Sequence, residues 1–276
     1  MNWTSPHNRT LPARGETPLI MGILNVSTDS FSDGGQYFTV KAAQAHAHSM
    51  IKNGADIIDV GAESTRPGAV LLSMDEELKR LVPQLVSLRG RFPKTPISVD
   101  TYKPEVARAA IENGADIIND VNADMVGGKY PMAELAAELK CPLIIMHNSR
   151  DEKIEGDFFE GFMRGMEFRL EKALSAGMSK DQIVLDPGFG FGKTVDQNYE
   201  LVRRLGELRV FGCAILLGVS RKSSIVAVVG DGMQARDDAT AAISAVSTFQ
   251  NSSDILRVHD VEKNLNAVKT AAMLRK

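Results

Sequence analysis

Short apolar runs alternate along the chain with longer stretches that have helical spacing. The runs cover Leu19 to Val26, Ile57 to Gly61, Ile97 to Asp100, Ile117 to Asp120, Leu143 to His147, Ile183 to Asp186, Ile215 to Ser220 and Ile255 to His259. Each run is almost continuously apolar, which is typical of parallel strands buried on both faces. Eight such strands, each followed by a helix, predict an α/β fold of the (β/α)8 TIM-barrel class.

The intervening stretches carry helix start and stop signals. Thr39 is a candidate N-cap, and Asn53-Gly54 is a typical stop. The predicted helices cover Lys41 to Lys52, Asp75 to Arg89, Pro104 to Glu112, Pro131 to Leu139, Phe158 to Ala176, Asn198 to Leu208, Arg236 to Gln250 and Val261 to Leu274. A length of 276 residues without a linker-like segment fits one barrel. We therefore expect a single barrel domain over residues 19–276, preceded by an N-terminal extension over residues 1–18.

A six-residue segment is repeated within the chain. The sequence Asn-Gly-Ala-Asp-Ile-Ile occurs at 53–58 and again at 113–118, and a degraded copy occupies 251–256. The pattern predicts a repeated corner in which a helix ends, a glycine turns the chain and a strand begins. Common descent of the units and convergence on favourable loop chemistry both explain the repeat, and both favour the same fold.

Composition and charge exclude several classes of protein. The 32 Lys and Arg residues against 35 Asp and Glu residues give a net charge of −3, so we expect no general nucleic-acid binding. No apolar run approaches ~18 residues, so we expect no membrane span. Residues 1–18 lack the apolar core of a secretory signal. The two isolated cysteines, Cys141 and Cys213, suit a reducing compartment, and we expect a cytoplasmic location.

Polar residues stand at the end of every predicted strand, where the chemistry of this fold class is located. They are Asn25, Asp59 with Glu63, Asp100, Asn119 with Asp120, His147, Asp186, Ser220 with Arg221 and Lys222, and Arg257 with His259. Any single one, such as Asp59 or Asp120, has the alternative role of capping a helix or pairing with a neighbour. A polar group at every strand end nevertheless indicates a functional rim.

The candidate rim residues have two kinds of chemistry. Carboxylates and amides can hold the N–H groups of a flat heterocycle, and the candidates are Asp100, Asn119 and Asp186. Cations can hold a phosphate or diphosphate, and the candidates are Arg66, Arg221, Lys222, Arg257 and His259. For Arg66 and Lys222 the alternative is a solvated surface charge. The combination indicates a ligand with a planar nitrogenous head and an anionic tail.

Two other motifs do not support the functions that they suggest at first sight. The segment Asp186 to Thr194 ends like the phosphate-binding loop of nucleotide hydrolases, but Pro187 stands where that loop requires glycine. His46 and His48 lie two positions apart on a predicted helix, so they face different directions and form no metal pair. We therefore expect neither nucleotide hydrolysis nor a histidine metal site.

Seven segments resemble the dihydropteroate synthase family of folate biosynthesis, in the order of that family and each at a strand end. They are Met21 to Gly35, Gly54 to Gly68, Ser98 to Ala107, Asp116 to Val121, Asp186 to Thr194, Leu217 to Ile225 and Leu256 to Val261. The similarity runs from about Met21 to the end of the chain. It implies a transferase that joins 6-hydroxymethyl-7,8-dihydropterin diphosphate to p-aminobenzoate, and releases 7,8-dihydropteroate and diphosphate.

The resemblance also implies the roles of individual residues. Catalytic residues would be Asp100, Lys222, Arg257 and His259. The pterin would be held by Asp100, Asn119, Asp186 and Lys222; the diphosphate by Asn25, Thr65, Arg66, Arg257 and His259; and p-aminobenzoate by Phe31, Thr65, Pro67 and Ser223. Asn25 would ligate Mg²⁺. The family further implies a homodimer and sensitivity to sulfonamides, which resemble p-aminobenzoate.

Two other functions stay open within the same fold. One is a non-catalytic pterin-binding paralogue, and the other is a pterin-dependent methyltransferase module that works with corrinoid proteins. The presence of both halves of the implied site favours the synthase. The chain departs from the family's usual residues at Ser27-Thr28, Ala62, Asn122-Ala123, Asn148 and Gln197, none of which is an implied ligand.

Overall fold

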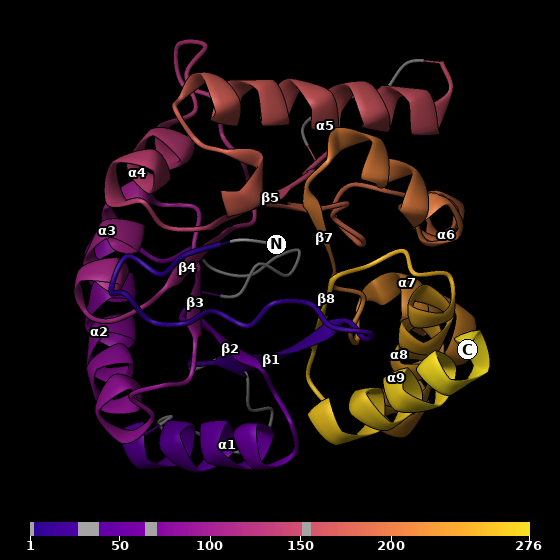
Figure 1. The fold of residues 1–276 in the computed structure, drawn as a ribbon, viewed down its shortest axis with the longest axis horizontal. Coiled ribbons are helices and arrows are strands. Elements are labelled where there is room, and N and C mark those ends of the chain that lie inside the picture. The colour runs from indigo at the N-terminus through magenta and orange to yellow at the C-terminus, as the bar shows by residue number, and fades with distance from the viewer. Residues whose placement is uncertain (1–2, 27–38, 64–70, 151–155) are drawn as a thin grey trace.

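The computed structural model describes residues 3–26, 39–63, 71–150 and 156–276, and these include a closed barrel of parallel strands. The strands are β1 (Leu19–Asn25), β2 (Ile57–Gly61), β3 (Ile97–Asp100), β4 (Ile117–Asp120), β5 (Leu143–Met146), β6 (Ile183–Asp186), β7 (Ala214–Leu217) and β8 (Ile255–Val258). They follow one another around the barrel in chain order, and β8 pairs with β1 (Figure 1). The predicted fold class is confirmed.

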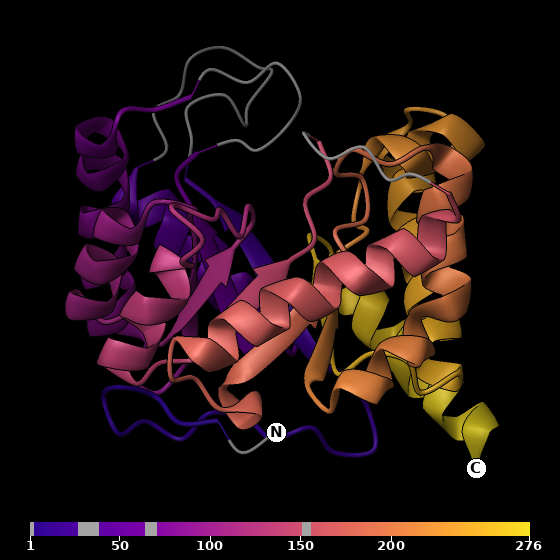
Figure 2. The ribbon, with the colours of Figure 1, turned by 90° about the horizontal axis from the view of Figure 1, so that it is seen from above.

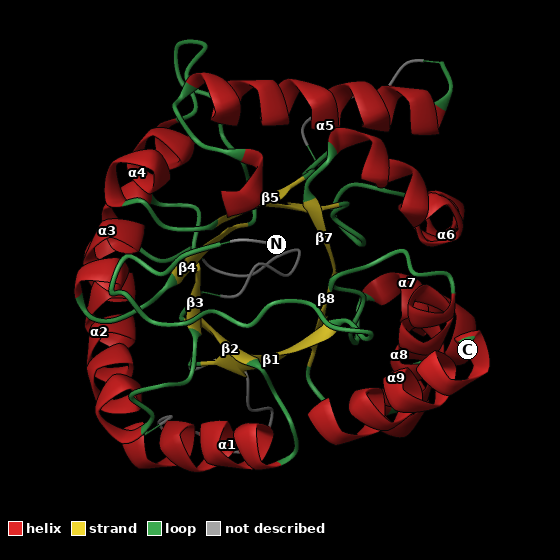
Figure 3. Cartoon of the chain, in the orientation of Figure 1, coloured by secondary structure: helices red, strands yellow, loops and turns green. Residues whose placement is uncertain are grey.

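A ring of helices surrounds the strands (Figure 3). The helices are α1 (Val40–Lys52), α2 (Met74–Arg91), α3 (Pro104–Glu112), α4 (Pro131–Leu139), α5 (Phe158–Ser175), α6 (Val195–Arg204), α7 (Ser223–Val229), α8 (Met233–Phe249) and α9 (Val261–Arg275), with 3-10 helices η2 (Lys180–Gln182) and η3 (Leu205–Phe211). None of the helices in the described ranges combines the length and the apolar character needed to cross a bilayer.

Helices α6, α7 and α8 differ from the sequence prediction, and α8 begins at Met233 rather than Arg236. Helix α6 begins at Val195 rather than Asn198, because Thr194 and Gln197 form a reciprocal capping box at its start. The predicted end at Leu208 falls inside η3, which continues the path of α6 to Phe211. The short helix α7 was not predicted; it lies between β7 and α8 and places Ser223 at its first position.

The inside of the barrel is divided into an apolar layer and a polar layer. Seven strands place an apolar side chain in the layer near their amino ends: Met21, Ile57, Ile117, Ile144, Val184, Leu216 and Ile255. Two positions further along a strand the side chain points to the same face. On β2, β4, β6 and β8 those positions are Asp59, Asn119, Asp186 and Arg257. The pleat therefore stacks the polar candidates above an apolar floor.

The repeated segment forms the corner that its sequence predicts. Gly54 and Gly114 adopt positive φ angles of 98° and 103°, which glycine tolerates best. The aspartate that follows accepts a hydrogen bond from the preceding strand, at 2.8 Å between Asp56 and the Ile20 N–H. The copies repeat this contact, from Ile97 to Asp116 at 3.0 Å and from Ile215 to Asp254 at 2.7 Å. Each corner thus fixes the start of its strand against the neighbouring unit.

Residues 3–18 run across the amino-terminal end of the barrel (Figure 2). Trp3 and Leu11 are buried against the apolar floor of the barrel. Arg9 pairs with Asp116 at 2.7 Å, and Arg14 pairs with Asp254 at 2.6 Å, so two corner aspartates also anchor this segment.

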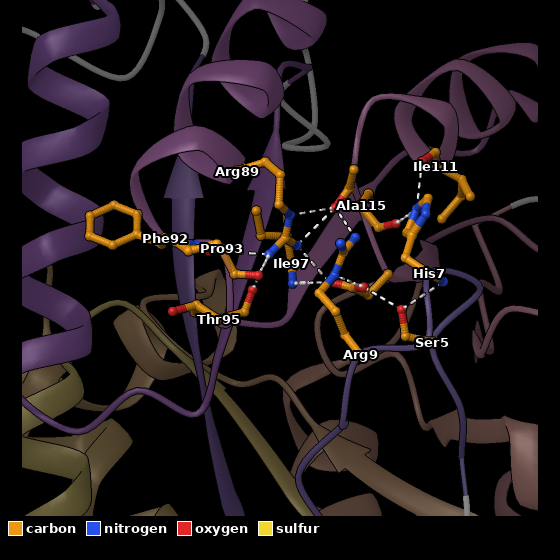
Figure 4. Close-up of polar contacts among 12 residues, drawn as sticks. Ser5, His7, Arg9, Arg89, Phe92, Pro93, Thr95, Ile97, Ile111 and Ala115 are labelled. Carbon is orange, nitrogen blue, oxygen red and sulfur yellow. Dashed lines mark hydrogen bonds and ion pairs between the residues drawn. The ribbon is translucent and has the colours of Figure 1, made fainter.

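Around Arg9, the side chains of Ser5, His7 and Arg89 converge on the same corner (Figure 4). The carboxyl ends of the strands lie at the opposite end of the barrel.

Candidate active site

The centre of the rim is an ion-pair bridge made by Arg257. Its Nε lies 2.6 Å from Oδ2 of Asp59 on β2, and its Nη2 lies 2.5 Å from Oδ2 of Asp100 on β3. The two aspartates are 0% and 8% exposed. Charged hydrogen bonds of this kind are short and directional, so the guanidinium is held in one orientation at the mouth of the barrel.

Asn119 on β4 joins the same bridge. Its side-chain amide donates to Oδ2 of Asp59 at 3.1 Å, and its backbone pairs in register with Asp100. With that donor committed, the side chain contributes its amide oxygen as a hydrogen-bond acceptor. The other oxygen of Asp100, Oδ1, is buried and has no hydrogen-bond partner among the described residues. A buried acceptor without a partner is costly, and a ligand N–H group would satisfy it.

Asp186 and Lys222 form the second half of the rim. Oδ1 of Asp186 accepts the backbone N–H of Gly188 at 2.8 Å, so this contact uses one of its two oxygens. The Lys222 ammonium donates to the carbonyl of Phe189 at 2.6 Å and lies 4.6 Å from the centre of the Phe191 ring. Lys222 is therefore tied to the rim and is not a solvated surface charge.

The glycine-rich segment that follows Asp186 is a compact turn. Lys193 donates to the carbonyls of His147, Gly188 and Phe191 at 2.9 to 3.0 Å, so its ammonium points into the turn. Gly188 has a φ of 69°, and a Cβ there would lie 2.0 Å from the carbonyl oxygen of His147. The segment therefore positions Asp186, Phe189 and Phe191.

An apolar wall that the sequence does not predict lies beside these polar groups. The wall consists of Val121, Met146 and Phe191, with Tyr102 packed against them. Val121 and Tyr102 follow β4 and β3, and Phe191 lies in the glycine-rich turn. The sequence does contain one signal for this wall: Val121 and Met146 stand directly beside the polar residues Asp120 and His147 at their strand ends. A flat ring placed against this wall would meet the carboxylates at its edge.

Burial changes the ionisation of the rim groups. It raises the pKa of Asp100 to about 7, although the adjacent Arg257 lowers it, while Asp59 and Glu77 raise it further. Burial also raises the pKa of Asp186, against the opposing effect of Lys222. For Lys222 burial lowers the pKa to about 8, with Asp186 acting in the opposite direction. Each charged form is thus poorly solvated and gains from a ligand of complementary charge.

The remaining cationic candidates separate into two groups. His259 follows β8 and is half-buried; its Nδ1 lies 2.9 Å from Oγ of Ser220, which follows β7. Arg221 forms two hydrogen bonds with Asp237 on α8, at 2.7 and 2.9 Å. Arg221 therefore has a structural ion-pair partner on α8, whereas His259, like Arg257, lies at the end of β8 on the rim.

Several other rim residues have structural partners. Asp120 accepts the N–H groups of Asn122 and Ala123 at 3.0 Å and the hydroxyl of Tyr130 at 2.8 Å, so it organises the loop after β4. Burial raises its pKa to about 6. Glu63 pairs with Lys103 at 2.6 Å. These contacts match the alternative roles considered for single acidic residues.

The structure describes only some of the remaining candidate residues. Asn25 ends β1, is half-buried, and pairs in register with Gly61 at the end of β2. Ser223 is exposed at the start of α7. Phe31, Thr65, Arg66 and Pro67, with Ser27 and Thr28, lie outside the described residues. Within the described residues, no three His, Cys, Asp or Glu side chains cluster as a metal site.

The arrangement combines a pair of hydrogen-bond acceptors, an apolar wall and cations at one end of a closed barrel. This is the architecture of a (β/α)8-barrel enzyme that binds a flat, nitrogen-rich ring together with an anionic group. The model of the pterin binding enzyme family matches residues 21–259, and the chain belongs to that family.

Within the family, the similarity is to dihydropteroate synthases. The dihydropteroate synthase of Streptococcus pyogenes serotype M3 is 46% identical over 257 residues, which make up 92% of this chain and 95% of that protein. The crystal structure of the Clostridium difficile dihydropteroate synthase in the presence of pteroic acid has a TM-score of 0.87 and 42% identity, and covers 95% of this chain and 99% of that one. The Yersinia pestis enzyme in a sulfonamide complex has a TM-score of 0.86 and 37% identity, and covers 96% and 98%.

Proposed function

We propose that this enzyme is a dihydropteroate synthase, which condenses 6-hydroxymethyl-7,8-dihydropterin diphosphate with p-aminobenzoate to give 7,8-dihydropteroate and diphosphate. The observation that carries the proposal is the buried oxygen of Asp100 that has no hydrogen-bond partner in the described part of the chain, beside Arg257 and the apolar wall. The relatives named above, among them one crystallised with pteroic acid, support the same reaction.

The pterin ring lies against Phe191 and Met146, with its N–H edge toward the acceptors. Asp186 receives N–H groups of the ring through the oxygen that its loop contact leaves available. Asn119 and Asp100 accept from the other edge, and Lys222 donates to a ring acceptor. A donor-rich heterocycle satisfies the buried carboxylates, whereas a ring with acceptors in those positions would leave them unpaired.

The diphosphate lies toward the cationic side of the rim. Arg257 and His259 contribute from the end of β8, and Thr65 and Arg66 contribute from the connection after β2. Cations positioned here stabilise the negative charge that builds on the leaving diphosphate.

Mg²⁺ fits the donor set at the end of β1. The Asn25 amide oxygen is a hard, neutral ligand, and Mg²⁺ typically keeps several waters and substrate phosphates around one or two protein oxygens. Asn25 would hold the ion, and the ion would add positive charge beside the leaving group.

Loss of diphosphate leaves positive charge on the methylene carbon of the pterin, as in an SN1-like displacement. The carboxylate of Asp100 stabilises that charge, and Arg257 keeps the carboxylate oriented. The amine of p-aminobenzoate then forms the new C–N bond and loses its proton. Phe31, Thr65, Pro67 and Ser223 hold p-aminobenzoate on the open side of the rim. A protein nucleophile is not required.

Sulfonamides compete with p-aminobenzoate in this proposal, because they present a similar arylamine. The enzyme works as a homodimer in the cytoplasm. Dimerisation is supported by the outer face of α8, where Val246 and Phe249 are 47% and 54% exposed, while Ala241 and Ile243 of the same helix pack inward. The free, buried thiols of Cys141 and Cys213 are compatible with a reducing compartment.

Diphosphate release by the purified protein tests the reaction. We expect release only when the pterin diphosphate, p-aminobenzoate and Mg²⁺ are all present, with dihydropteroate as the second product. Release that is independent of p-aminobenzoate would contradict the proposal. Methyl transfer from methyltetrahydrofolate would instead support the methyltransferase alternative, and pterin binding without turnover would support the non-catalytic paralogue.

A further inference from the structure

Asn198 is a buried amide that joins three segments beneath the second half of the rim. It lies in the first turn of α6 and is 0% exposed. Its Oδ1 accepts the backbone N–H of Gly190, in the glycine-rich turn, at 2.6 Å. Its Nδ2 donates to Oγ of Ser224 on α7 at 2.8 Å, and to the carbonyl of Thr194, the N-cap of its own helix, at 2.8 Å. One side chain therefore connects the glycine-rich turn with both α6 and α7.

The position of Lys222 depends on both segments that Asn198 connects to α6. Lys222 is the N-cap of α7 and stands two residues before Ser224, so its backbone belongs to the start of that helix. Its side chain lies on the glycine-rich turn, because the ammonium donates to the carbonyl of Phe189 at 2.6 Å. The stem lies against Gly190, where an added Cβ would be 2.9 Å from Cδ of the lysine. Asn198 thus fixes the helix that carries Lys222 and the turn that receives its side chain.

An aromatic contact between Phe189 and Tyr199 also holds the glycine-rich turn against α6. The two rings meet edge to face, with 6.1 Å between their centres. Apolar burial is not directional, whereas a hydrogen bond fixes both a distance and a direction. Loss of the Asn198 amide is therefore expected to leave the turn packed on α6 but to release its fixed position relative to α7.

We propose that Asn198 is a positioning residue that holds the Lys222 ammonium at the rim and thereby sets the affinity for the pterin ring. The inference rests on the proposed function, in which Lys222 donates to an acceptor of that ring. Asn198 is fully buried, so its effect on the ring passes through the residues that it holds. A purely structural amide would change the stability of the protein without changing the affinity for the ring.

A double-mutant cycle tests whether Asn198 acts through Lys222. In Lys222→Met the ring loses a charged donor, so we expect the dissociation constant of 6-hydroxymethylpterin to rise about 10- to 100-fold. In Asn198→Ala we expect a rise of about 5-fold or more, because a small displacement of a binding group has a large effect. The double variant should bind as Lys222→Met does, since both changes act on one interaction. Calorimetric titration measures all three values. Additive effects would overturn the inference, as would an unchanged affinity in Asn198→Ala.

Ser247→Ala is the control for the loss of a buried hydrogen-bonding side chain. Ser247 is 0% exposed, and its hydroxyl lies 2.9 and 2.7 Å from Oγ of Ser252 and Ser253, in the corner that precedes β8 at the amino-terminal end of the barrel. We expect its Tm to fall while its affinity for 6-hydroxymethylpterin stays within about 2-fold of the wild type, because the changed contacts are remote from the rim. An equal loss of affinity in Ser247→Ala and Asn198→Ala would contradict the positioning role.

The pKa of Lys222 separates this inference from the proposed function, because its measurement requires no ligand. Burial lowers that pKa to about 8, while Asp186 and Asp100 raise it and Arg257 and Arg150 lower it further. An ammonium that leaves its place on the glycine-rich turn becomes better hydrated, so its pKa should rise.

Competitive acetylation over a range of pH, followed by mass spectrometry of the peptide that contains Lys222, measures this pKa. We expect a higher value in Asn198→Ala than in the wild type, and no change in Ser247→Ala. An unchanged pKa in Asn198→Ala would overturn the positioning role itself. A Lys222→Met variant that binds 6-hydroxymethylpterin as tightly as the wild type would instead overturn the pterin role of Lys222 in the proposed function, and with it the effect on affinity. Ser224→Ala, which removes the link to α7, provides the same tests if Asn198→Ala does not fold.

Discussion

Arg257 and Asp100 meet across the mouth of the barrel although they are 157 positions apart in the sequence, with 2.5 Å between Nη2 and Oδ2. They come from β8 and β3, which are not neighbours in the barrel. The contact exists because both side chains point inward at the carboxyl ends of their strands and because Asp59 holds the guanidinium from a third direction. This ion-pair bridge therefore fixes the orientation of the Arg257 guanidinium at the rim.

Replacement of Asp59 tests that dependence. In Asp59→Asn the Nε of Arg257 loses its charged acceptor while the size of the side chain is kept. We expect kcat/KM for the pterin diphosphate to fall by about 10- to 100-fold, with a loss of stability of about 1–3 kcal/mol. Steady-state diphosphate release and urea unfolding measure the two effects. The control is Asp237→Asn, which breaks the Arg221–Asp237 pair. This pair lies away from the mouth, so its loss should lower stability more than kcat/KM.

Asp186→Asn tests the pterin acceptors. The substituted amide oxygen still accepts from Gly188, so the loop contact is retained, but an NH₂ group replaces the second oxygen, which in the proposed function accepts from the pterin. We expect the pterin affinity to fall about 100-fold, which corresponds to ~2.7 kcal/mol. Calorimetric titration with 6-hydroxymethylpterin measures it. An affinity equal to that of the wild type would remove Asp186 from the pterin site.

The raised pKa of Asp100 predicts a dependence of stability on pH. Its pKa of about 7 in the folded chain lies above the ordinary value of 3.8, so the folded state binds this proton more tightly than the unfolded state. The resulting contribution to stability is complete below about pH 4 and is lost as the pH rises through about 7. In Asp100→Asn this loss is absent, so its Tm relative to the wild type should increase between about pH 5 and pH 8. A Tm difference that is constant over this range would contradict the prediction.

Lys140 offers a stabilising substitution. It caps α4 in the left-handed conformation, with φ 54° and ψ 39°, and its side chain is exposed. Lys140→Gly is expected to raise the free energy of unfolding by about 0.5–1 kcal/mol, because glycine adopts this conformation without strain. Lys269→Gly, at an exposed position inside α9, is the matched control and should lower it by about 1 kcal/mol. Urea titration of both variants measures the two changes in the free energy of unfolding, which should have opposite signs.

The segment before β1 is expected to stabilise the barrel without taking part in binding. Trp3 is 6% exposed, packs on the apolar floor, and donates its indole N–H to the carbonyl of Pro12 at 2.9 Å. Trp3→Ala should therefore cost about 3–5 kcal/mol of stability. Substrate KM values measured well below Tm should not change, since the floor separates Trp3 from the rim. A selective change in one KM would show that the two ends of the barrel are coupled.

The sequence alone determined the order of strands and helices and the closed barrel, because continuous apolar runs and helix boundary signals are local properties. It also predicted the corners themselves, since a glycine turn followed by a strand repeats at 53–58 and 113–118, but not the hydrogen bonds that their aspartates accept. The helix α7 escaped detection because a seven-residue segment carries too little periodicity to be distinguished from a loop.

Tertiary structure decided which polar residues contribute to the mouth of the barrel and which ones stabilise the loops around it. Asp59 and Asp120 look alike in sequence, yet one orients Arg257 and the other organises the loop that leads to Tyr130. Likewise Arg221 pairs with Asp237, while its neighbour Lys222 is held over Phe191. The roles differ because each depends on partners from distant strands, and closure of the barrel brings those partners together in a way that no local pattern encodes.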